Sequence, residues 1–155
     1  HYTFTWDISG VSRALLQEMS RHRHQNLSVR SSRYTLNQLK KQPAFEGKNY
    51  SKAKNFIYFT GNVKVDNRSI AALNALQEVI KAGVSNDETK YCMPEAFFTS
   101  FISTMNVRAF KNFFALRSSP AALKEIQELA RAMYEVIPED VKFLIAEEKK
   151  NEENS

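Results

Sequence analysis

The sequence predicts a mixed fold, in which strands and helices share one chain of 155 residues. Residues 1–8 and 97–105 are rich in β-forming side chains that alternate between two faces, which is typical of half-buried strands. Other stretches repeat apolar side chains three or four positions apart, as one face of an α-helix does. The length predicts one domain around one core, because domains most often hold about 100–150 residues.

The composition excludes several classes of protein. The net charge of +5 favours anionic ligands but is modest for a dedicated nucleic-acid binder. No apolar run approaches the roughly 20 residues of a membrane helix, and no secretory signal is visible. The single cysteine, Cys92, suits a reducing cytoplasm and is expected to be a buried, inert thiol. We therefore expect a cytoplasmic protein that binds neither membranes nor nucleic acid. A nucleic-acid binder that uses the basic run at 21–34 and the lysine-rich segment 35–54 is the lowest-ranked alternative, because no nucleic-acid-binding motif is recognised.

Two common kinds of site are missing from the sequence. Its three histidines and one cysteine show no metal-ligand spacing, so no metal site is expected. Its four glycines do not assemble a glycine-rich phosphate loop.

The chain is expected to begin with a strand and a helix in direct succession. The strand over residues 1–8 is interrupted before Gly10, and apolar residues at helical spacing continue as far as His22. Glu18 lies on this apolar stripe, where a buried carboxylate needs a cation or a hydrogen-bond donor. The expected partner is Arg21 or an amide of a ligand.

The middle of the chain is less clearly patterned. Residues 35–54 are polar and lysine-rich, which favours a mobile surface loop, with a lid over a site as the alternative. Residues 56–59 form a short apolar run that fits a strand or a helix. Asp66 or Asn67 is expected to cap a helix that closes at Gly83.

The next segments return to regular patterns. A short helical turn is predicted to begin at Asn86, to carry Lys90 and to end near Pro94. The alternating strand over residues 97–105 follows.

The helix predicted over residues 107–116 places polar groups on two faces. Its apolar stripe finishes at Arg117, and an unpaired cation in the interior is costly, so Arg117 is expected to meet an anionic or acceptor-rich partner. Arg108 and Asn112 lie one turn apart on another face and can reach a ligand together. The alternative for Arg108 is a pair with a surface carboxylate.

The final helix is predicted to run from Ser119, the expected cap, to Pro138. Leu123 and Val136 are expected on its buried stripe. Residues 147–155 are charged and lack apolar anchors, which predicts a frayed or disordered tail.

A basic run follows the first helix. Residues 21–34 read RHRHQNLSVRSSRY, in which arginines and histidines alternate with serines. Arginine presents a planar fork of donors that suits phosphate and carboxylate oxygens, and serine hydroxyls complete such a shell without adding charge. An anion pocket at the end of a helix is one interpretation. A solvated basic helix end, stabilised by the helix dipole, is the other.

A resemblance decides between these two interpretations. Arg-His-Arg at 21–23, followed after seven residues by Ser31, resembles the signature of flavin-dependent thymidylate synthases, the ThyX family. The match extends to residues 8–14 before it, to Ser-Ser-Arg-Tyr at 31–34, and to a second block within residues 105–117. The sequences of these motifs resemble those of the epsilonproteobacterial branch of the family most.

The resemblance also implies an architecture. The family has an α+β fold, with a central, mostly antiparallel sheet flanked by helices, and assembles as a homotetramer whose sites combine residues from different subunits. Residues 1–146 would form a single ThyX-like catalytic domain and 147–155 the charged tail. In the family a strand and helices precede the position of His1, so the chain is expected to be N-terminally incomplete.

The implied reaction is the reductive methylation of dUMP to dTMP. Methylenetetrahydrofolate supplies the carbon, FAD carries it, and NADPH is the reductant. Arg117 would be the catalytic residue, placed against the uracil ring to stabilise its ionised N3 form. The FAD-binding positions implied by the motifs are Arg21, His22, Arg23, Val29, Asn106, Arg108 and Asn112. The dUMP-binding positions implied are Glu18, Ser20, Arg21, Arg30, Ser31, Ser32, Arg33, Lys90 and Arg117.

Some positions depart from the commoner family pattern. Glu18 replaces a frequent glutamine and cannot donate a hydrogen bond while ionised. Val29 replaces a frequent glutamate, and Lys90 replaces arginine, which keeps the charge but loses the bidentate fork. The alternative to an active enzyme is therefore a truncated or diverged member that binds dUMP or flavin without turnover.

Overall fold

The computed structural model describes residues 2–145, within which one three-stranded sheet is found. The strands are β1 (Thr3–Ser12), β2 (Gln25–Val29) and β3 (Phe98–Asn106). The sheet order is β1-β3-β2 and both pairings are antiparallel, so the connection from β1 to β2 passes over the central strand β3, whereas β2 and β3 are direct neighbours. The expected α+β class with an antiparallel sheet is confirmed.

The first strand is longer than predicted because a bulge lies within it. Pairing with β3 runs regularly from Thr3 opposite Asn106 to Ser9 and then shifts register before Val11. Gly10 occupies the bulge with φ of 70°, a left-handed conformation that glycine adopts without the steric cost of a side chain. The glycine that was expected to end the strand therefore only bends it.

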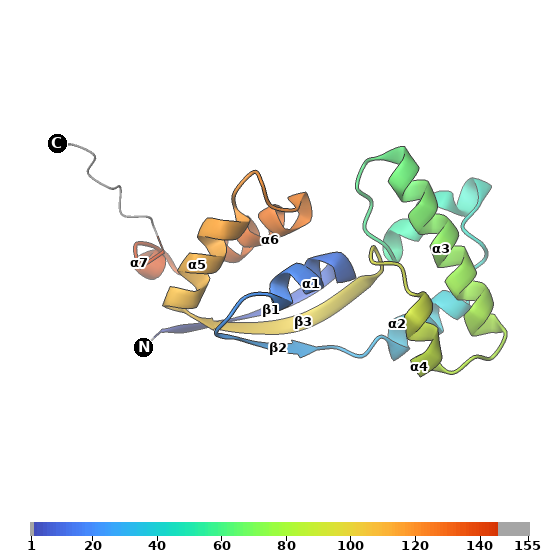
Figure 1. Ribbon diagram of the computed structural model, residues 1–155, viewed down its shortest axis with the longest axis horizontal. Coiled ribbons are helices and arrows are strands. Elements are labelled where there is room, and N and C mark those ends of the chain that lie inside the picture. Colours follow the sequence, from blue (N-terminus) through green and yellow to red (C-terminus); the bar gives the residue numbers. More distant parts are fainter. Residues whose placement is uncertain (1, 146–155) are drawn as a thin grey trace.

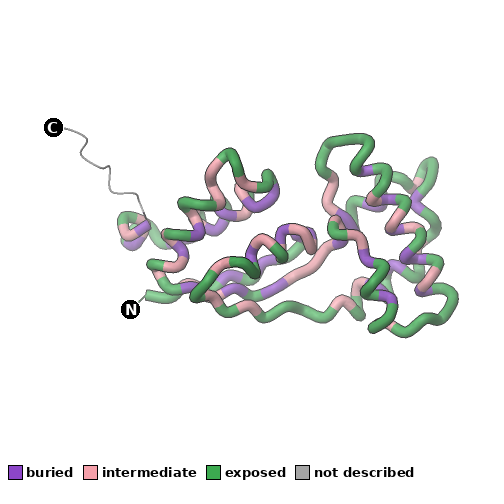
Figure 2. The backbone as a smooth tube through the Cα atoms, in the orientation of Figure 1, coloured by how far each residue is buried: buried purple, intermediate pink, exposed green. Residues whose placement is uncertain are grey.

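One face of the sheet is covered and the other is open to solvent. Phe4, Trp6 and Ile8 point to the same face as their β3 partners, among them Phe101 and Met105, and this face is largely buried. Helices α1 (Arg13–Ser20), α5 (Val107–Arg117) and α6 (Lys124–Glu135) lie on that side of the sheet (Figure 1). The alternating polar residues of β1 face the opposite side and are exposed (Figure 2).

The covered face and its helices form the first hydrophobic cluster. The short helix α7 (Glu139–Lys142) closes it. Trp6 also donates a hydrogen bond from Nε1 to the carbonyl oxygen of Met133 on α6 (3.2 Å). The buried members of this cluster are Trp6, Ile8, Val11, Leu15, Met19, Phe101, Met105, Phe110, Phe113, Ile126, Ala130, Met133, Ile137, Val141 and Ile145.

A second hydrophobic cluster lies beyond the far end of the sheet, so the prediction of a single core is wrong. Its buried members are Leu36, Leu39, Phe45, Ala53, Phe56, Ile57, Ile70, Leu73, Leu76, Ile80, Met93 and Phe97. Phe97, just before β3, is part of this cluster, and its carbonyl accepts from the N–H of Arg13 at the start of α1 (3.0 Å), which ties the two clusters together. Its elements, on the right of Figure 1, are α2 (Arg33–Lys40), the 3₁₀ helix η1 (Gly47–Asn55), α3 (Val63–Lys81), α4 (Asn86–Thr89) and the 3₁₀ turn η2 (Lys90–Cys92).

The loop predicted over residues 35–54 is largely helical instead. Leu36 and Leu39 are fully buried at helical spacing in α2, and Gln77 of α3 donates to the carbonyl oxygen of Leu39 (2.9 Å) and to that of Gln42 (2.7 Å). The lysines made the helical spacing of the leucines hard to recognise in the sequence, because they lie close to them in the chain and occupy the solvent-facing side. Residues 56–59 form neither a helix nor a full strand, and only Ile57 makes an isolated bridge to Phe97.

The start of α3 lies one turn before the predicted cap. Asn62 is the N-cap and its side chain accepts from the N–H groups of Lys64 and Val65. Asp66 lies inside the first turn, buried, where its carboxylate accepts from the N–H groups of Thr60 and Gly61. An aspartate that folds the preceding loop onto the helix resembles a cap in sequence.

The last long helix begins later than predicted. Ser119 forms a turn instead, accepting from the N–H of Ala121 (3.3 Å), and α6 starts only at Lys124. Leu123 and Val136 are exposed, contrary to expectation. The loop before α6 is held by Gln127, whose side chain donates to the carbonyl oxygen of Ala122 (2.8 Å).

Of the remaining predictions, some are confirmed and one is wrong. Cys92 is exposed rather than buried, because the neighbouring Met93 takes the buried position. The short turn around Lys90 and the strand ending near Met105 are confirmed. Strand β2 was not predicted. The predicted tail, residues 147–155, lies outside the described residues.

None of the helices in residues 2–145 combines the length and the apolar character that crossing a bilayer requires. The same residues contain no cluster of histidine, cysteine or carboxylate side chains suited to a metal ion.

Candidate functional site

Two segments that are far apart in the sequence form the walls of one pocket. The residues that follow α1 lie beside α5, because α1 and α5 pack on the same face of the sheet (Figure 1). The pocket between them has a volume of about 770 Å³. It is lined by Arg21, His22, Arg23, His24, Asn106, Arg108, Ala109, Asn112, Leu116 and Arg117.

The α5 side of this pocket begins at the helix N-terminus. Asn106 is the N-cap, and its side-chain oxygen accepts from the N–H of Ala109 (2.8 Å), which leaves its amide group as a donor. Arg108 and Asn112 lie one turn apart and both line the pocket, as predicted. Within residues 2–145 no carboxylate lies within ion-pair distance of Arg108. The pairing alternative for Arg108 is therefore not found there.

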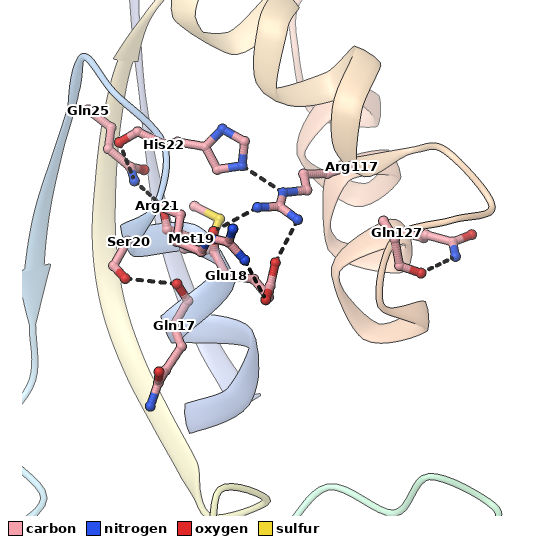
Figure 3. A network of polar contacts seen from close by, with 10 residues as sticks. Gln17, Glu18, Met19, Ser20, Arg21, His22, Gln25, Arg117 and Gln127 are labelled. Carbon is pink, nitrogen blue, oxygen red and sulfur yellow. Dashed lines mark hydrogen bonds and ion pairs between the residues drawn. The ribbon is translucent and has the colours of Figure 1, made fainter.

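Arg117 is held by three hydrogen bonds at the wall of the pocket (Figure 3). Its Nε donates to His22 Nε2 (2.7 Å), its Nη1 to Glu18 Oε2 (2.6 Å) and its Nη2 to the main-chain oxygen of Glu18 (3.1 Å). The side chain is only 16% exposed. The prediction that Arg117 meets an anionic partner is confirmed, and within the protein this partner is Glu18.

The same contacts answer the prediction for Glu18. Its carboxylate pairs chiefly with Arg117, and Arg21 lies farther away, with 3.7 Å between Arg21 Nη1 and Glu18 Oε1. Arg21 was one of the two expected partners, and it does contact Glu18, although more weakly than Arg117 does. Sequence spacing suggested Arg21 because it lies one turn away on the same helix.

His22 is adapted to accept a hydrogen bond. Burial lowers its pKa below the ordinary value of 6.5, and the positive charge of Arg117 adds to this effect, while Glu18 opposes it and Arg21 lowers it further. The neutral ring can accept at Nε2 from Arg117, which assigns its proton to Nδ1. The ring also packs edge-on against Phe113, with 5.0 Å between ring centroids.

The loop after α1 has a fixed and unusual course. Gln25 donates from Nε2 to the carbonyl oxygens of Met19 and His22, which closes the turn (Figure 3). His24 has φ of 59°, the left-handed region that non-glycine residues rarely adopt. This strained residue lines the pocket, where such outliers gather in proteins.

A second pocket lies at the other end of β2. Its volume is about 480 Å³ and its lining includes the basic and hydroxyl groups that follow that strand. Those lining residues are Gly10, Arg30, Ser31, Ser32, Tyr34, Thr35, Gln38, Asn55, Phe98, Thr99 and Ser100.

The predicted phosphate-binding residues give this second pocket its polar character. Arg30 pairs through Nη2 with Asp7 Oδ2 (2.6 Å), and its N–H donates to the carbonyl oxygen of Ser100 (2.8 Å). Ser31 Oγ accepts from the N–H of Arg33 (3.4 Å). Ser32 is the N-cap residue of α2 but makes no side-chain capping bond, so its hydroxyl is not used to cap that helix.

The remaining predicted positions line neither pocket. Val29 is exposed on the edge strand β2, and Ser20 donates to the carbonyl oxygen of Gln17 (2.8 Å). Lys90 pairs with Asp87 (2.8 Å), and this contact is the main cause that lowers the pKa of Asp87, with a smaller effect from Arg33. Lys90 and Arg33 therefore lie near the same carboxylate.

Sequence analysis missed several lining residues of both pockets. His24, Ala109 and Leu116 were not assigned to the first pocket, although each lies next to a residue that was. Gln38 and Asn55 belong to the second pocket but fall in or next to the segment interpreted as a loop. Their signal was the pair of buried leucines in α2, which predicts a helix packed beside the serines.

Comparisons with known proteins agree on one family. The family described as "Thymidylate synthase complementing protein" matches residues 1–141. A flavin-dependent thymidylate synthase of Wolinella succinogenes is 44% identical over 144 residues, covering 93% of this chain and 71% of that protein. The enzyme of the same name from Campylobacter jejuni is 43% identical, over 93% of this chain and 70% of its own length.

Solved structures give the same result. The crystal structure of thymidylate synthase X from Helicobacter pylori with FAD and dUMP matches this fold with a TM-score of 0.86 and 40% sequence identity. The match covers 92% of this chain and 71% of that one.

Proposed function

The chain belongs to the flavin-dependent thymidylate synthase family, and from this membership we propose that it binds FAD and dUMP and converts dUMP to dTMP. The carbon donor is methylenetetrahydrofolate and the reductant is NADPH. The observation that carries the proposal is the pocket of about 770 Å³ into which both motif blocks bring their side chains.

The donors of this pocket fit FAD. Arginine forks bind phosphate oxygens in bidentate geometry, and the pyrophosphate of FAD carries two negative charges. The amide groups of Asn106 and Asn112 can bond neutral polar groups of the cofactor. Four arginines line the pocket, namely Arg21, Arg23, Arg108 and Arg117.

Bound FAD supplies the redox and carbon-carrier chemistry, while the residues of the chain bind, orient and polarise. Arg117 engages three of its five N–H donors within the protein, which leaves two for the uracil ring. Its guanidinium favours negative charge on that ring, and neutral His22 keeps the guanidinium edge in place. We therefore assign Arg117 as the catalytic residue.

The second pocket is proposed to bind the phosphate of dUMP. Arg30 supplies a charge and Ser31 and Ser32 supply hydroxyl groups at the start of α2. Arg33 and Lys90 lie outside that lining, near Asp87, and would contribute through the local positive charge.

The separation of the two pockets supports an assembly. From His24 to Arg30 the chain advances six residues along β2, roughly 20 Å at about 3.3 Å per residue. That span exceeds the length of a nucleoside monophosphate. The residues at the two ends of β2 therefore lie too far apart to bind one nucleotide within a single chain, and we propose a homotetramer in which a second copy completes each site.

The test is a visible absorption spectrum of the purified protein mixed with FAD, followed by dUMP and NADPH. We expect bound flavin that bleaches with NADPH and dTMP that appears once methylenetetrahydrofolate is added. Arg108→Gln should weaken FAD binding by roughly tenfold or more, since a charge-assisted contact is lost. Arg131→Gln is the matched control, because Arg131 lies on α6, away from the pocket lining.

The other outcomes are informative as well. Flavin or dUMP binding without dTMP would identify a member that binds without turnover. Absence of flavin binding would contradict the proposal. Sedimentation of the protein with FAD checks the tetramer, and cell fractionation checks the proposed cytoplasmic location, which the single cysteine favours.

A further inference from the structure

Glu18 contacts Arg117 through two different groups. The carboxylate oxygen Oε2 lies 2.6 Å from Nη1, and the main-chain oxygen lies 3.1 Å from Nη2 (Figure 3). Together with His22 on Nε, these contacts fix the plane of the guanidinium. An arginine side chain otherwise samples many rotamers, and holding it costs conformational entropy that must be offset before a ligand arrives.

Glu18 also has a particular place in the charge pattern of the pocket. Within residues 2–145, it is the one carboxylate that forms ion pairs with arginines of the pocket lining, at 2.6 Å from Arg117 and 3.7 Å from Arg21. The charged groups that act on His22 are the same three residues, namely Glu18 on α1, Arg21 at the C-cap of α1 and Arg117 on α5. Glu18 is therefore the local counter-charge of the site.

We propose that Glu18 is a positioning residue for Arg117, which it holds in one orientation, and that its negative charge limits how tightly the pocket binds an anionic nucleotide. The proposal rests on the function proposed above. A glutamine at this position would keep an acceptor for Arg117 but lose the charge, and an aspartate would keep the charge but withdraw it by one methylene group. Glutamine is a weaker, neutral acceptor and aspartate is a shorter one, so both changes loosen the hold on Arg117, and only glutamine also removes the charge.

The proposed charge effect predicts that loss of the Glu18 charge tightens dUMP binding, which a purely structural role of Glu18 does not predict. A carboxylate repels a bound anion, so Glu18→Gln should lower the Kd for dUMP by roughly threefold to tenfold, as expected for one charge at several ångströms in a partly solvated site. Its kcat should fall by about tenfold, because the guanidinium is less firmly oriented. Loss of structure would instead raise the Kd and lower kcat together.

The conservative variant completes the comparison. Glu18→Asp should bind dUMP with nearly the Kd of the unchanged protein, since the charge remains, while its kcat falls as in Glu18→Gln. Glu128→Gln is the matched control, because it removes one negative charge from an exposed site on α6 that pairs with Lys124 at 3.9 Å. It should change neither quantity.

A direct readout of orientation does not depend on activity. In ¹⁵N–¹H spectra the Nε–H of Arg117 should exchange slowly with water, because it donates to His22, and its signal is identified by its loss in Arg117→Lys. We expect roughly tenfold faster exchange in Glu18→Gln and Glu18→Asp, and no change in Glu128→Gln. The pKa of His22 should also fall further in Glu18→Gln, since Glu18 is the group that raises it.

Each result decides the proposal. Glu18→Gln with the exchange rate of Glu128→Gln overturns the positioning role, and a weaker affinity of Glu18→Gln for dUMP overturns the charge role. If the unchanged protein neither binds dUMP nor forms dTMP, the proposed function fails. The Arg117 exchange rate still reports whether Glu18 positions this side chain, so the two failures are distinguishable.

Discussion

Removal of the Glu125 carboxylate should destabilise the first hydrophobic cluster more than any surface change on the same helix. Glu125, on α6, is 7% exposed and accepts two hydrogen bonds from Ser12, from the N–H to Oε1 (2.7 Å) and from Oγ to Oε2 (2.5 Å). Ser12 is 1% exposed and is also the N-cap of α1, where its Oγ accepts from the N–H of Leu15. This contact thus joins α6 to the junction of β1 and α1.

The magnitude follows from the two bonds. A hydrogen bond to a charged group contributes roughly 1.5–3 kcal/mol, and a buried donor left without a partner costs about 1–3 kcal/mol. For Glu125→Ala, which leaves both donors of Ser12 unpaired, we expect a loss of roughly 3–5 kcal/mol in the free energy of unfolding, because two hydrogen bonds to a charged group are lost. Glu125→Gln retains one acceptor and should cost about 1–2 kcal/mol.

The assay uses the single tryptophan of the chain as a local probe. Trp6 lies in the same cluster and donates to the carbonyl oxygen of Met133 on α6, so its fluorescence in a urea titration reports on this packing. Glu128→Ala is the control on the same helix and should change stability by less than about 0.5 kcal/mol. A loss below about 1 kcal/mol for Glu125→Ala would refute the reasoning.

Three further predictions concern the site and its surroundings. Because the folded-state pKa of His22 lies below 6.5, the unfolded chain binds more protons at this residue, so the free energy of unfolding should fall as the pH drops below 6.5 towards that lower pKa. The urea midpoints at pH 7.5 and pH 5.5 should therefore differ less in His22→Gln than in the unchanged protein. Equal differences in the two proteins would contradict this. Gly10→Ala should lower the free energy of unfolding by roughly 1–2 kcal/mol in a urea titration, because φ of 70° is strained for residues other than glycine. No atom lies within 4 Å of an added Cβ, so the cost comes from the backbone alone. A variant as stable as the unchanged protein would show that Gly10 does not adopt the bulge conformation. In the absence of ligand, Arg108→Gln should raise the free energy of unfolding by a few tenths of a kcal/mol, since a cation in the first turn opposes the helix dipole. A variant less stable than the unchanged protein would show that Arg108 has a stabilising partner.

The parts of the fold that sequence predicted are those in which local pattern and burial agree. Strand β3 and helix α5 alternate or repeat their apolar residues in the way that the structure buries them. The polar end of the α5 stripe predicted a partner for Arg117, and the structure supplies Glu18. That inference worked because an interior cation requires compensation whatever the fold.

The missed parts depend on contacts that no local pattern encodes. Strand β2 carries only Leu27 and Val29 as apolar residues, and it is a strand because β3 offers it a free edge. The division of the basic run between two pockets follows from this strand, which separates His24 from Arg30. Sequence spacing placed these residues close together, whereas an extended strand of five residues moves them apart.

The ends of two helices explain why the site tolerates so much positive charge. The partial negative charge of a helix C-terminus stabilises a nearby cation, and Arg21 caps the C-terminus of α1 while Arg117 ends α5. Arg108 has no such support, because it lies in the first turn of α5, where the dipole opposes a cation and where the described residues offer no carboxylate. A residue placed against its local electrostatics is expected where a ligand compensates for it. We therefore propose that the phosphates of a bound nucleotide cofactor restore the charge balance at Arg108.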